Sequence, residues 1–215
     1  MDTKEQNYYI LSLTENPDSL ALWSSYSNFF GYNLGLDGSD LAEIISNQKN
    51  TTPRNIHGKV IYDRTLQYQI IRDEINNTKI PSLYNKYLES KNTELIGQLN
   101  IEISALAVVL GAYGLFFKDP LFCQEEEYRI VFFHLEAESL SLKLNHEIRF
   151  RDRNGTIVPY IEVPMTNHQG HLPVREIVIG PKNNIDIAEH GIDFLLYRLK
   201  NKNVAIRRSG IPLRY

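Results

Sequence analysis

The sequence predicts an α+β protein, with helices mainly in the first half around a long buried central helix and a mostly antiparallel sheet in the second half. Three features of the 215 residues support this fold class. Apolar residues recur at helical spacing through most of the first half. Residues 103–117 are almost entirely apolar, and a helix without a polar face must be enclosed by other elements. Beyond Pro120, short runs rich in β-branched and aromatic residues alternate with turn residues.

Strands and helices alternate in the first third of the chain. Pro17 suits the first turn of a helix, and Gly31 suits its end. The expected strands are 8–13, 32–37 and 57–63. The expected helices are 17–30, 41–45, 66–88 with an interruption at 76–81, and a long helix from 93 to about 117.

The second half is expected to form one sheet that packs on the long helix. A hairpin turn falls at Asp152-Arg153-Asn154-Gly155, since Asn-Gly favours the tight turns that join antiparallel strands. The expected strands are 128–135, 147–151, 157–163, 174–179 and 204–208, with a helix at 183–199. We therefore expect one domain, 1–215, with a helix-rich lobe that contains short strands at 1–118 and a sheet-rich lobe at 119–215.

Composition narrows the class of protein. A net charge of −3 argues against a chain that coats nucleic acid, although a local basic patch remains compatible with it. The single cysteine, Cys123, has no disulfide partner within the chain. The first residues lack the order of a secretory signal, so we expect a cytoplasmic protein. The apolar run 103–117 is too short to cross a bilayer, so we expect no membrane partner.

The most informative stretch is 116–131, where three consecutive acids and Arg129 lie between the apolar helix and an apolar strand. Burying such a cluster requires a cation, a metal or hydrogen-bond donors, and such places are often functional sites. We expect Glu127 and Arg129 to project to opposite sides of the strand, because Glu127 lies at its boundary. We also expect Glu127 to approach Arg149 or Arg151.

Several segments occur in an order that resembles a known family. They are the run LSLTENPDSLALWSSY at 11–26, the stretch from Phe117-Lys118 to EEEYR at 125–129, Pro159-Tyr160, IVIGP at 177–181 and SGIPLR at 209–214. In this order they are similar to the bacterial family called domain of unknown function 2971, over nearly the whole chain. Members usually begin with a further segment, and this chain starts after it. Ser25 stands where many members carry a histidine before the tyrosine. Both departures bear on any transferred activity.

The residue types suit an anionic ligand with an aromatic or ribosyl part, such as a nucleotide or NAD. Arginine matches phosphate, an aromatic ring stacks a base, and a carboxylate holds a ribose hydroxyl. The set is similar in kind to ADP-ribosyltransferases. In that interpretation the catalytic residues are Glu127, which orients the nicotinamide ribose, and Glu125, which faces the acceptor. The expected ligand-binding residues are Trp23, Tyr26, Arg129, Arg151, Tyr160, Ser209 and Arg214.

Other interpretations stay open, including whether this chain is an enzyme. Glu127, Arg129 and Arg151 can instead form a structural ion-pair network. The chain can be a non-catalytic partner-binding or regulatory protein that contacts another protein chain. A third interpretation is a metal-dependent nuclease in which Asp119, Glu125 and Glu127 collect Mg²⁺. The sequence assigns no metal ligand by itself, and it leaves the substrate, the oligomeric state and the biological pathway open.

Overall fold

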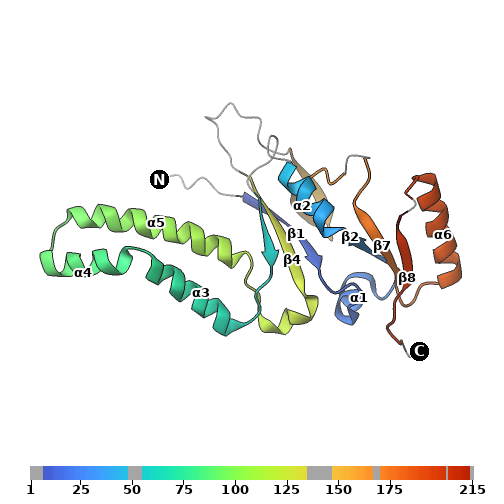
Figure 1. Cartoon of the computed structure of the whole chain (residues 1–215), viewed down its shortest axis with the longest axis horizontal. Helices are drawn as coiled ribbons and strands as arrows, with labels where there is room; N and C mark the ends of the chain where they lie inside the picture. The colour runs from blue at the N-terminus through green and yellow to red at the C-terminus, as the bar shows by residue number, and fades with distance from the viewer. Residues whose placement is uncertain (1–6, 48–54, 135–146, 167–169, 202, 214–215) are drawn as a thin grey trace. The chain divides into compact units, whose positions relative to one another are not determined.

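The computed structural model describes residues 7–47, 55–134, 147–166, 170–201 and 203–213 (Figure 1). It confirms a mixed α+β fold. The helices are α1 Leu20–Ser27, α2 Gly38–Asn47, α3 Arg64–Asn77, α4 Ile80–Ser90, α5 Glu94–Gly114, the short 3-10 helix η2 Pro120–Glu125, and α6 Ile185–Arg198. The strands are β1 Asn7–Thr14, β2 Tyr32–Leu36, β3 Asn55–Lys59, β4 Glu127–His134, β5 Ile148–Arg153, β6 Thr156–Ile161, β7 Val174–Ile179 and β8 Ala205–Arg208.

The predicted elements are present, with shifts at their ends. One such shift is at α1, which begins at Leu20 instead of Pro17. Ser19 has an extended backbone, and its side chain accepts the backbone N–H of Leu22. A serine in this arrangement is an N-cap, so the helix begins only after it.

The prediction that the strands of the second half form one sheet is wrong. The described strands form three sheets, in the orders β1-β4-β3, β2-β7-β8 and β5-β6. The pairs β2–β7 and β5–β6 are antiparallel, whereas β7 and β8 are parallel. The parallel pair has a local cause, because the intervening helix α6 returns the chain to the end of the sheet from which β7 started.

The chain forms two compact units. Unit 1 contains Met1–His57 and Ile130–Tyr215, and unit 2 contains Gly58–Arg129. The chain passes from unit 1 into unit 2 along β3 and leaves unit 2 along β4. These boundaries do not follow the expected division after residue 118. The expectation of a single domain over 1–215 stays a prediction.

The core of unit 1 contains strands that are buried over several consecutive residues. Ile177, Val178 and Ile179 of β7 are buried, as are residues 130–132 of β4. Helix α6 packs Ile192 against Ile177 and Ile179. Consecutive buried residues mean that both faces of these strands are covered, which explains their unbroken apolar sequence.

The loop after α1 is held in an uncommon backbone conformation. Asn28 and Phe29 have positive φ values of 50° and 69°, which residues other than glycine rarely adopt. Asn183 secures the loop, because its side-chain amide accepts from the N–H of Gly31 and donates to its carbonyl, at 3.0 and 2.9 Å. A Cβ at Gly180 would lie 3.0 Å from two carbonyl oxygens of this loop, so the close approach requires a glycine.

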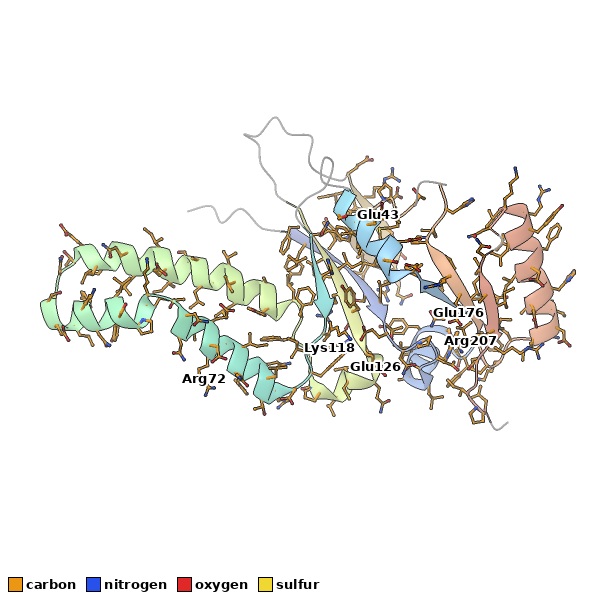
Figure 2. The ribbon with its side chains drawn as sticks, in the orientation of Figure 1. Glu43, Arg72, Lys118, Glu126, Glu176 and Arg207 are labelled. Carbon is orange, nitrogen blue, oxygen red and sulfur yellow. The ribbon has the colours of Figure 1, made fainter. Side chains whose placement is uncertain are left out.

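Unit 2 contains the largest departure from the predicted fold, because helix α5 is not a buried central helix. One stripe of α5, formed by Leu95, Leu99, Leu106, Leu110 and Tyr113, is buried or partly buried. Helices α3 and α4 pack along α5. Figure 2 shows side chains that project from the edge of α5 turned away from these two helices. The prediction is wrong because α3 and α4 cover only one stripe of α5, and the other face stays exposed.

Helix α5 is longer than the apolar run 103–117 from which no membrane-spanning segment was expected. The helix has 21 residues, so by length and composition alone it could cross a membrane. Its neighbour α3 is polar, however, and it carries Arg72, Asp73 and Glu74. The hydroxyl of Tyr113 on α5 donates to Glu74 at 3.0 Å. A bilayer around α5 would enclose these charges, which is costly.

Matched truncations on the two faces of α5 test this description. Leu99 is 9% exposed and Ile101 is 71% exposed. We expect Leu99→Ala to lower the free energy of unfolding by about 2 to 4 kcal/mol, because it leaves a cavity. We expect Ile101→Ala to change it by less than about 0.5 kcal/mol. Urea denaturation of both variants measures the difference. An equal loss of unfolding free energy in both would mean that α5 is buried on both faces.

Candidate functional site

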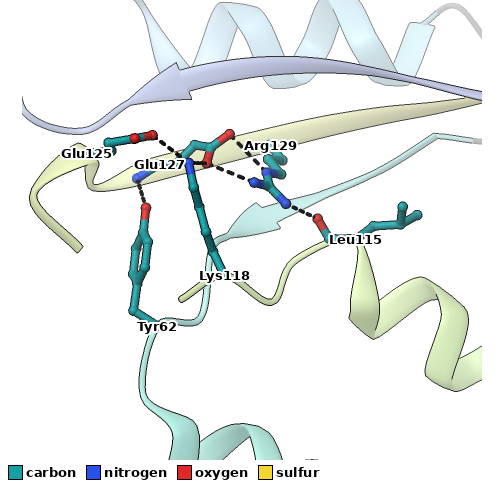
Figure 3. Close-up of polar contacts among 6 residues, drawn as sticks. All are labelled: Tyr62, Leu115, Lys118, Glu125, Glu127 and Arg129. Atoms are coloured by element: carbon teal, nitrogen blue, oxygen red, sulfur yellow. Dashed lines mark hydrogen bonds and ion pairs between the residues drawn. The ribbon is translucent and has the colours of Figure 1, made fainter. Parts of the chain in front are cut away.

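A cluster of four charged side chains, centred on Glu127, lies in unit 2 (Figure 3). Arg129 donates from Nε to one carboxylate oxygen of Glu127 at 2.9 Å and from Nη2 to the other at 3.0 Å. Lys118 Nζ lies 3.0 Å from Glu127 and 2.6 Å from Glu125. Arg129 also donates to the backbone carbonyl of Leu115 at 2.5 Å. We call Lys118, Glu125, Glu127 and Arg129 the ion cluster.

The local sequence explains how these side chains come together. Asp119 caps η2 by accepting the N–H of Leu121, and Pro120 fits the first position of that short helix. Glu126 then turns the chain with a positive φ of 43°. Strand β4 begins at once with Glu127, whose backbone N–H donates to the hydroxyl of Tyr62 at 3.0 Å.

The prediction that Glu127 and Arg129 project to opposite sides is wrong. Strand β4 already includes Glu127, so both residues lie inside the strand and two positions apart. Residues two apart in a strand share a face, which is why the guanidinium meets the carboxylate. The fork of two parallel hydrogen bonds is the strongest form of this pairing.

The ion cluster balances its own charge. Two carboxylates face two cations, and Glu127 is only 6% exposed. A buried charge is tolerated when it is paired and hydrogen-bonded, and Glu127 is both. Burial by itself lowers the pKa of Lys118, but hydrogen bonds to Glu125 and Glu127 outweigh it and raise that pKa above 10.5. Burial, together with the nearby Glu127 charge, raises the pKa of Tyr62, although its bond to the Glu127 backbone acts in the opposite direction.

This geometry favours a structural role for Glu127. Both of its carboxylate oxygens are held by cations. Lys118 and Glu125 keep 22% and 20% of their side chains exposed, so only the outer part of the cluster can meet a ligand. The third acid of the nuclease interpretation, Asp119, pairs with Arg64 at 2.6 Å. Among the described residues, the structure contains no group of three His, Cys, Asp or Glu side chains that could hold a metal ion.

A second polar cluster, in unit 1, is centred on Asp18. One carboxylate oxygen of Asp18 accepts from the indole N–H of Trp23 and from the hydroxyl of Ser209, each at 2.7 Å. The other oxygen accepts the backbone N–H of Gly210 at 2.7 Å. One aspartate therefore joins the start of α1 to the segment that follows β8. Burial raises the pKa of Asp18, but hydrogen bonds from Ser209, Trp23 and Gly210, with Arg207 nearby, outweigh it and leave that pKa below 3.8.

A cross-strand ion pair and the β5–β6 hairpin carry further charges of unit 1. Figure 2 labels Glu176 on β7 and Arg207 on β8, which pair at 2.7 Å. In the hairpin, the guanidinium of Arg151 lies 5.5 Å from the ring centroid of Tyr160. Arg149 pairs with Glu162 at 2.8 Å. Arg149 and Arg151 are thus engaged with neighbouring side chains.

The predicted site residues fall into three groups. Glu125, Glu127 and Arg129 meet in the ion cluster, Trp23 and Ser209 meet at Asp18, and Arg151 and Tyr160 meet in the hairpin. Tyr26 is exposed on α1. Trp23 is buried, so the indole ring lies in the core and does not line an open ligand site. Arg214 lies outside the described residues. The expected approach of Glu127 to the hairpin arginines stays a prediction, and the acid's observed cationic partners are Lys118 and Arg129.

Sequence reasoning missed Lys118, Tyr62 and Asp18 as organising residues. Lys118 could have been found, because three adjacent acids near an apolar core require a cation and this lysine is the basic residue just before them. Asp18 carried a weaker signal as a polar residue ahead of a helix. Tyr62 carried none, since its contact joins positions 65 residues apart.

The fold and the ion cluster describe a mixed α+β protein with a buried, self-neutralising charge network. The chain belongs to the family described as protein of unknown function (DUF2971), whose model matches residues 22–130. The matched segment includes most of α1 and the whole ion cluster. Comparison with curated proteins gives no match, and comparison with solved structures gives none either.

Substitution of Glu127 measures the contribution of the ion cluster to stability. Glu127→Gln removes the charge that holds Arg129, and we expect it to cost roughly 3 kcal/mol, since it leaves a cation buried without its partner. Glu126→Gln is the matched control, because Glu126 is exposed and the expected change is within about 0.5 kcal/mol. Chemical denaturation compares the two, and a wild-type midpoint for Glu127→Gln would contradict the structural role.

The Asp18 cluster predicts a stability difference that depends on pH. Because the pKa of folded Asp18 is lowered, its contribution is present above 3.8, the unfolded value, and is lost as the pH falls through the folded value. We expect Asp18→Asn to lower the free energy of unfolding by about 1 to 3 kcal/mol at neutral pH. This deficit should shrink below pH 3.8. Trp23 is the single tryptophan, so its fluorescence follows the transition. A deficit that is constant down to acid pH would disprove the charged role.

Proposed function

We propose that this protein is a non-catalytic partner-binding protein whose partner is another protein chain, and that the outward face of α5 is its binding surface. The observation that carries the proposal is the exposure of large aliphatic side chains on that face. Ile101 is 71% exposed and Val108 is 68% exposed. Exposed apolar surface of this kind, on a helix that keeps its own inner face covered, is typical of an interaction site.

The charge distribution on α5 supports a protein partner. Between residues 95 and 117 the only charged residue is Glu102, which lies on the partly buried side of the helix. The outward face is therefore uncharged. The fully buried centre of a protein interface is also depleted of charge. Removing the exposed part of Ile101 and of Val108 from water contributes roughly 1 to 2 kcal/mol each.

The ion cluster supports the same proposal, because its geometry is that of a structural anchor. The bidentate pair of Glu127 with Arg129 secures β4, and Arg129 in turn holds the carbonyl of Leu115 just after α5. The cluster thus positions the C-terminal end of α5 within unit 2. In this proposal the acids serve to orient a binding helix.

Substitution on the outward face of α5 tests the function. The full chain carrying Ile101→Ser and Val108→Ser is compared with wild type for binding to each component that mass spectrometry identifies after isolation from the native host. We expect at least one purified component, a second copy of this chain included, to bind wild type and to bind the variant at least about tenfold more weakly. Melting temperatures of the two proteins should agree, because both side chains are exposed.

The matched control for this test is Leu66→Ser, another exposed apolar residue of unit 2 that lies on α3. It removes apolar surface elsewhere and should leave binding unchanged. If wild type and the α5 variant bind every component with the same affinity, the outward face of α5 is not the binding surface and the proposal fails.

A second candidate function is a nucleotide- or NAD-binding enzyme similar to ADP-ribosyltransferases. The observation that favours it is the convergence of Glu125 and Glu127, two positions apart, on the partly exposed Lys118. Nicotinamide release from NAD by the wild-type chain, lost in Glu125→Gln, would select this candidate. Glu125 is the residue to change, because substitution of Glu127 is expected to disturb the fold.

A further inference from the structure

We infer that the partner of α5 is a second copy of this chain, and that two α5 helices pack antiparallel through the stripe Gly97, Ile101, Ser104, Val108 and Gly111. This inference rests on the proposed function, because it names the partner for the same surface. The geometry of the exposed face and the arrangement of its small and large residues support it.

The stripe has the spacing of a helix–helix contact. Its positions are separated by four, three, four and three residues, so they lie along one line of the helix. All five residues are exposed. The partly buried stripe of α5, which includes Leu99 and Leu106, lies on the opposite side. Helix α5 therefore has two contact faces, and α3 and α4 account for only one of them.

The glycines of α5 give an independent reason to place another helix against this stripe. A glycine inside a helix is unfavourable relative to alanine, so its presence calls for a cause. Gly97 and Gly111 do not have positive φ, and in the described structure a Cβ at either position would meet no atom within 4 Å. Neither the backbone conformation nor packing within unit 2 requires these glycines. Small residues on a helix surface allow another backbone to approach closely.

The order of residue sizes fits an antiparallel copy of the same helix. When Ser104 of one copy lies opposite Val108 of the other, Ile101 lies opposite Gly111, and the two-fold axis passes near residue 106. Each large side chain then faces a small one, and every contact occurs twice, as a two-fold interface requires. Gly97 falls opposite Leu115, which continues the alternation. In a parallel pair, like residues would face one another and the glycines would leave gaps.

The same features favour a second copy over a lipid surface. The stripe contains Ser104 and two glycines, whereas a lipid-facing surface gains most from large apolar side chains. The alternation of large and small residues improves packing only against a surface of complementary shape, which a lipid bilayer does not offer. The axial length of α5, about 31 Å at 1.5 Å per residue, gives a contact several turns long.

Filling the small positions of the stripe tests the inference on the full chain. Sedimentation equilibrium over about a hundredfold range of concentration should show dimers of the wild type. We expect Gly111→Leu to weaken dimerisation at least about tenfold, because the new side chain occupies the space of Ile101 of the second copy. At protein concentrations where the wild type is also monomeric, the melting temperature of the variant should not fall, since leucine is the better helix former. Gly114→Leu is the matched control, because Gly114 is equally open but lies off the stripe.

Cysteine cross-linking tests the orientation without disturbing the fold. In a Cys123→Ser background, Ser104→Cys combined with Val108→Cys should form intermolecular disulfides, because these positions face each other in the antiparallel register. Ser104→Cys alone should cross-link poorly, whereas in a parallel dimer it would cross-link efficiently. Efficient cross-linking by the single variant therefore overturns the antiparallel arrangement.

The outcomes separate this inference from the proposed function. A wild-type protein that is monomeric at every concentration overturns the inference, as does an equal effect of Gly111→Leu and Gly114→Leu. Flotation of that monomer with phosphatidylcholine vesicles would assign the face to lipid instead. If the chain is monomeric but another purified component still requires Ile101 and Val108 for binding, only the inference fails. If substitution of Ile101 and Val108 alters no binding at all, both fail.

Discussion

The pairing of Glu127 with Arg129 is the interaction on which the geometry of unit 2 depends. Two hydrogen bonds fix the carboxylate on β4, and the same guanidinium reaches the carbonyl of Leu115 after α5. Lys118 adds Glu125 to the network. Segments before and after η2 are thereby held by one buried, neutral group of charges. Loss of Glu127 would leave Arg129 buried without its carboxylate partner, whereas Lys118 and Glu125 lie at the more exposed edge of the cluster.

The ion cluster and the inner face of α5 together hold the helix in place, so that its exposed face stays available for binding. A helix with one free apolar face must be held by its other face and its ends if that face is to stay available. Leu99 and its neighbours hold the inner side against α3 and α4, and Arg129 holds the C-terminal end. In unit 1, Asp18 plays a comparable part for α1 and the segment after β8, although with hydrogen bonds from neutral groups. In both clusters an acidic side chain accepts hydrogen bonds from separate segments and holds them together.

The candidate site was only partly predictable from the sequence. The crowded acids, the need for a cation and the importance of Glu127 and Arg129 could all be inferred, because charge next to an apolar core carries a known cost. Their shared face could not, because it depended on whether β4 begins at Glu127 or one residue later. The joining of Asp18 to Ser209 was also out of reach, since 191 residues separate them.

The sequence by itself determined the mixed fold class and the order of helices and strands, because hydrophobic periodicity and turn residues act locally. Tertiary structure alone decided that the strands divide among three sheets, that β7 and β8 run parallel and that α5 keeps an exposed face. The apolar composition of α5 indicates only that burying its surface is favourable in free energy. Whether that surface is covered by the same chain or by another depends on how many neighbours the fold places around it, and around α5 the fold places α3 and α4 on one side.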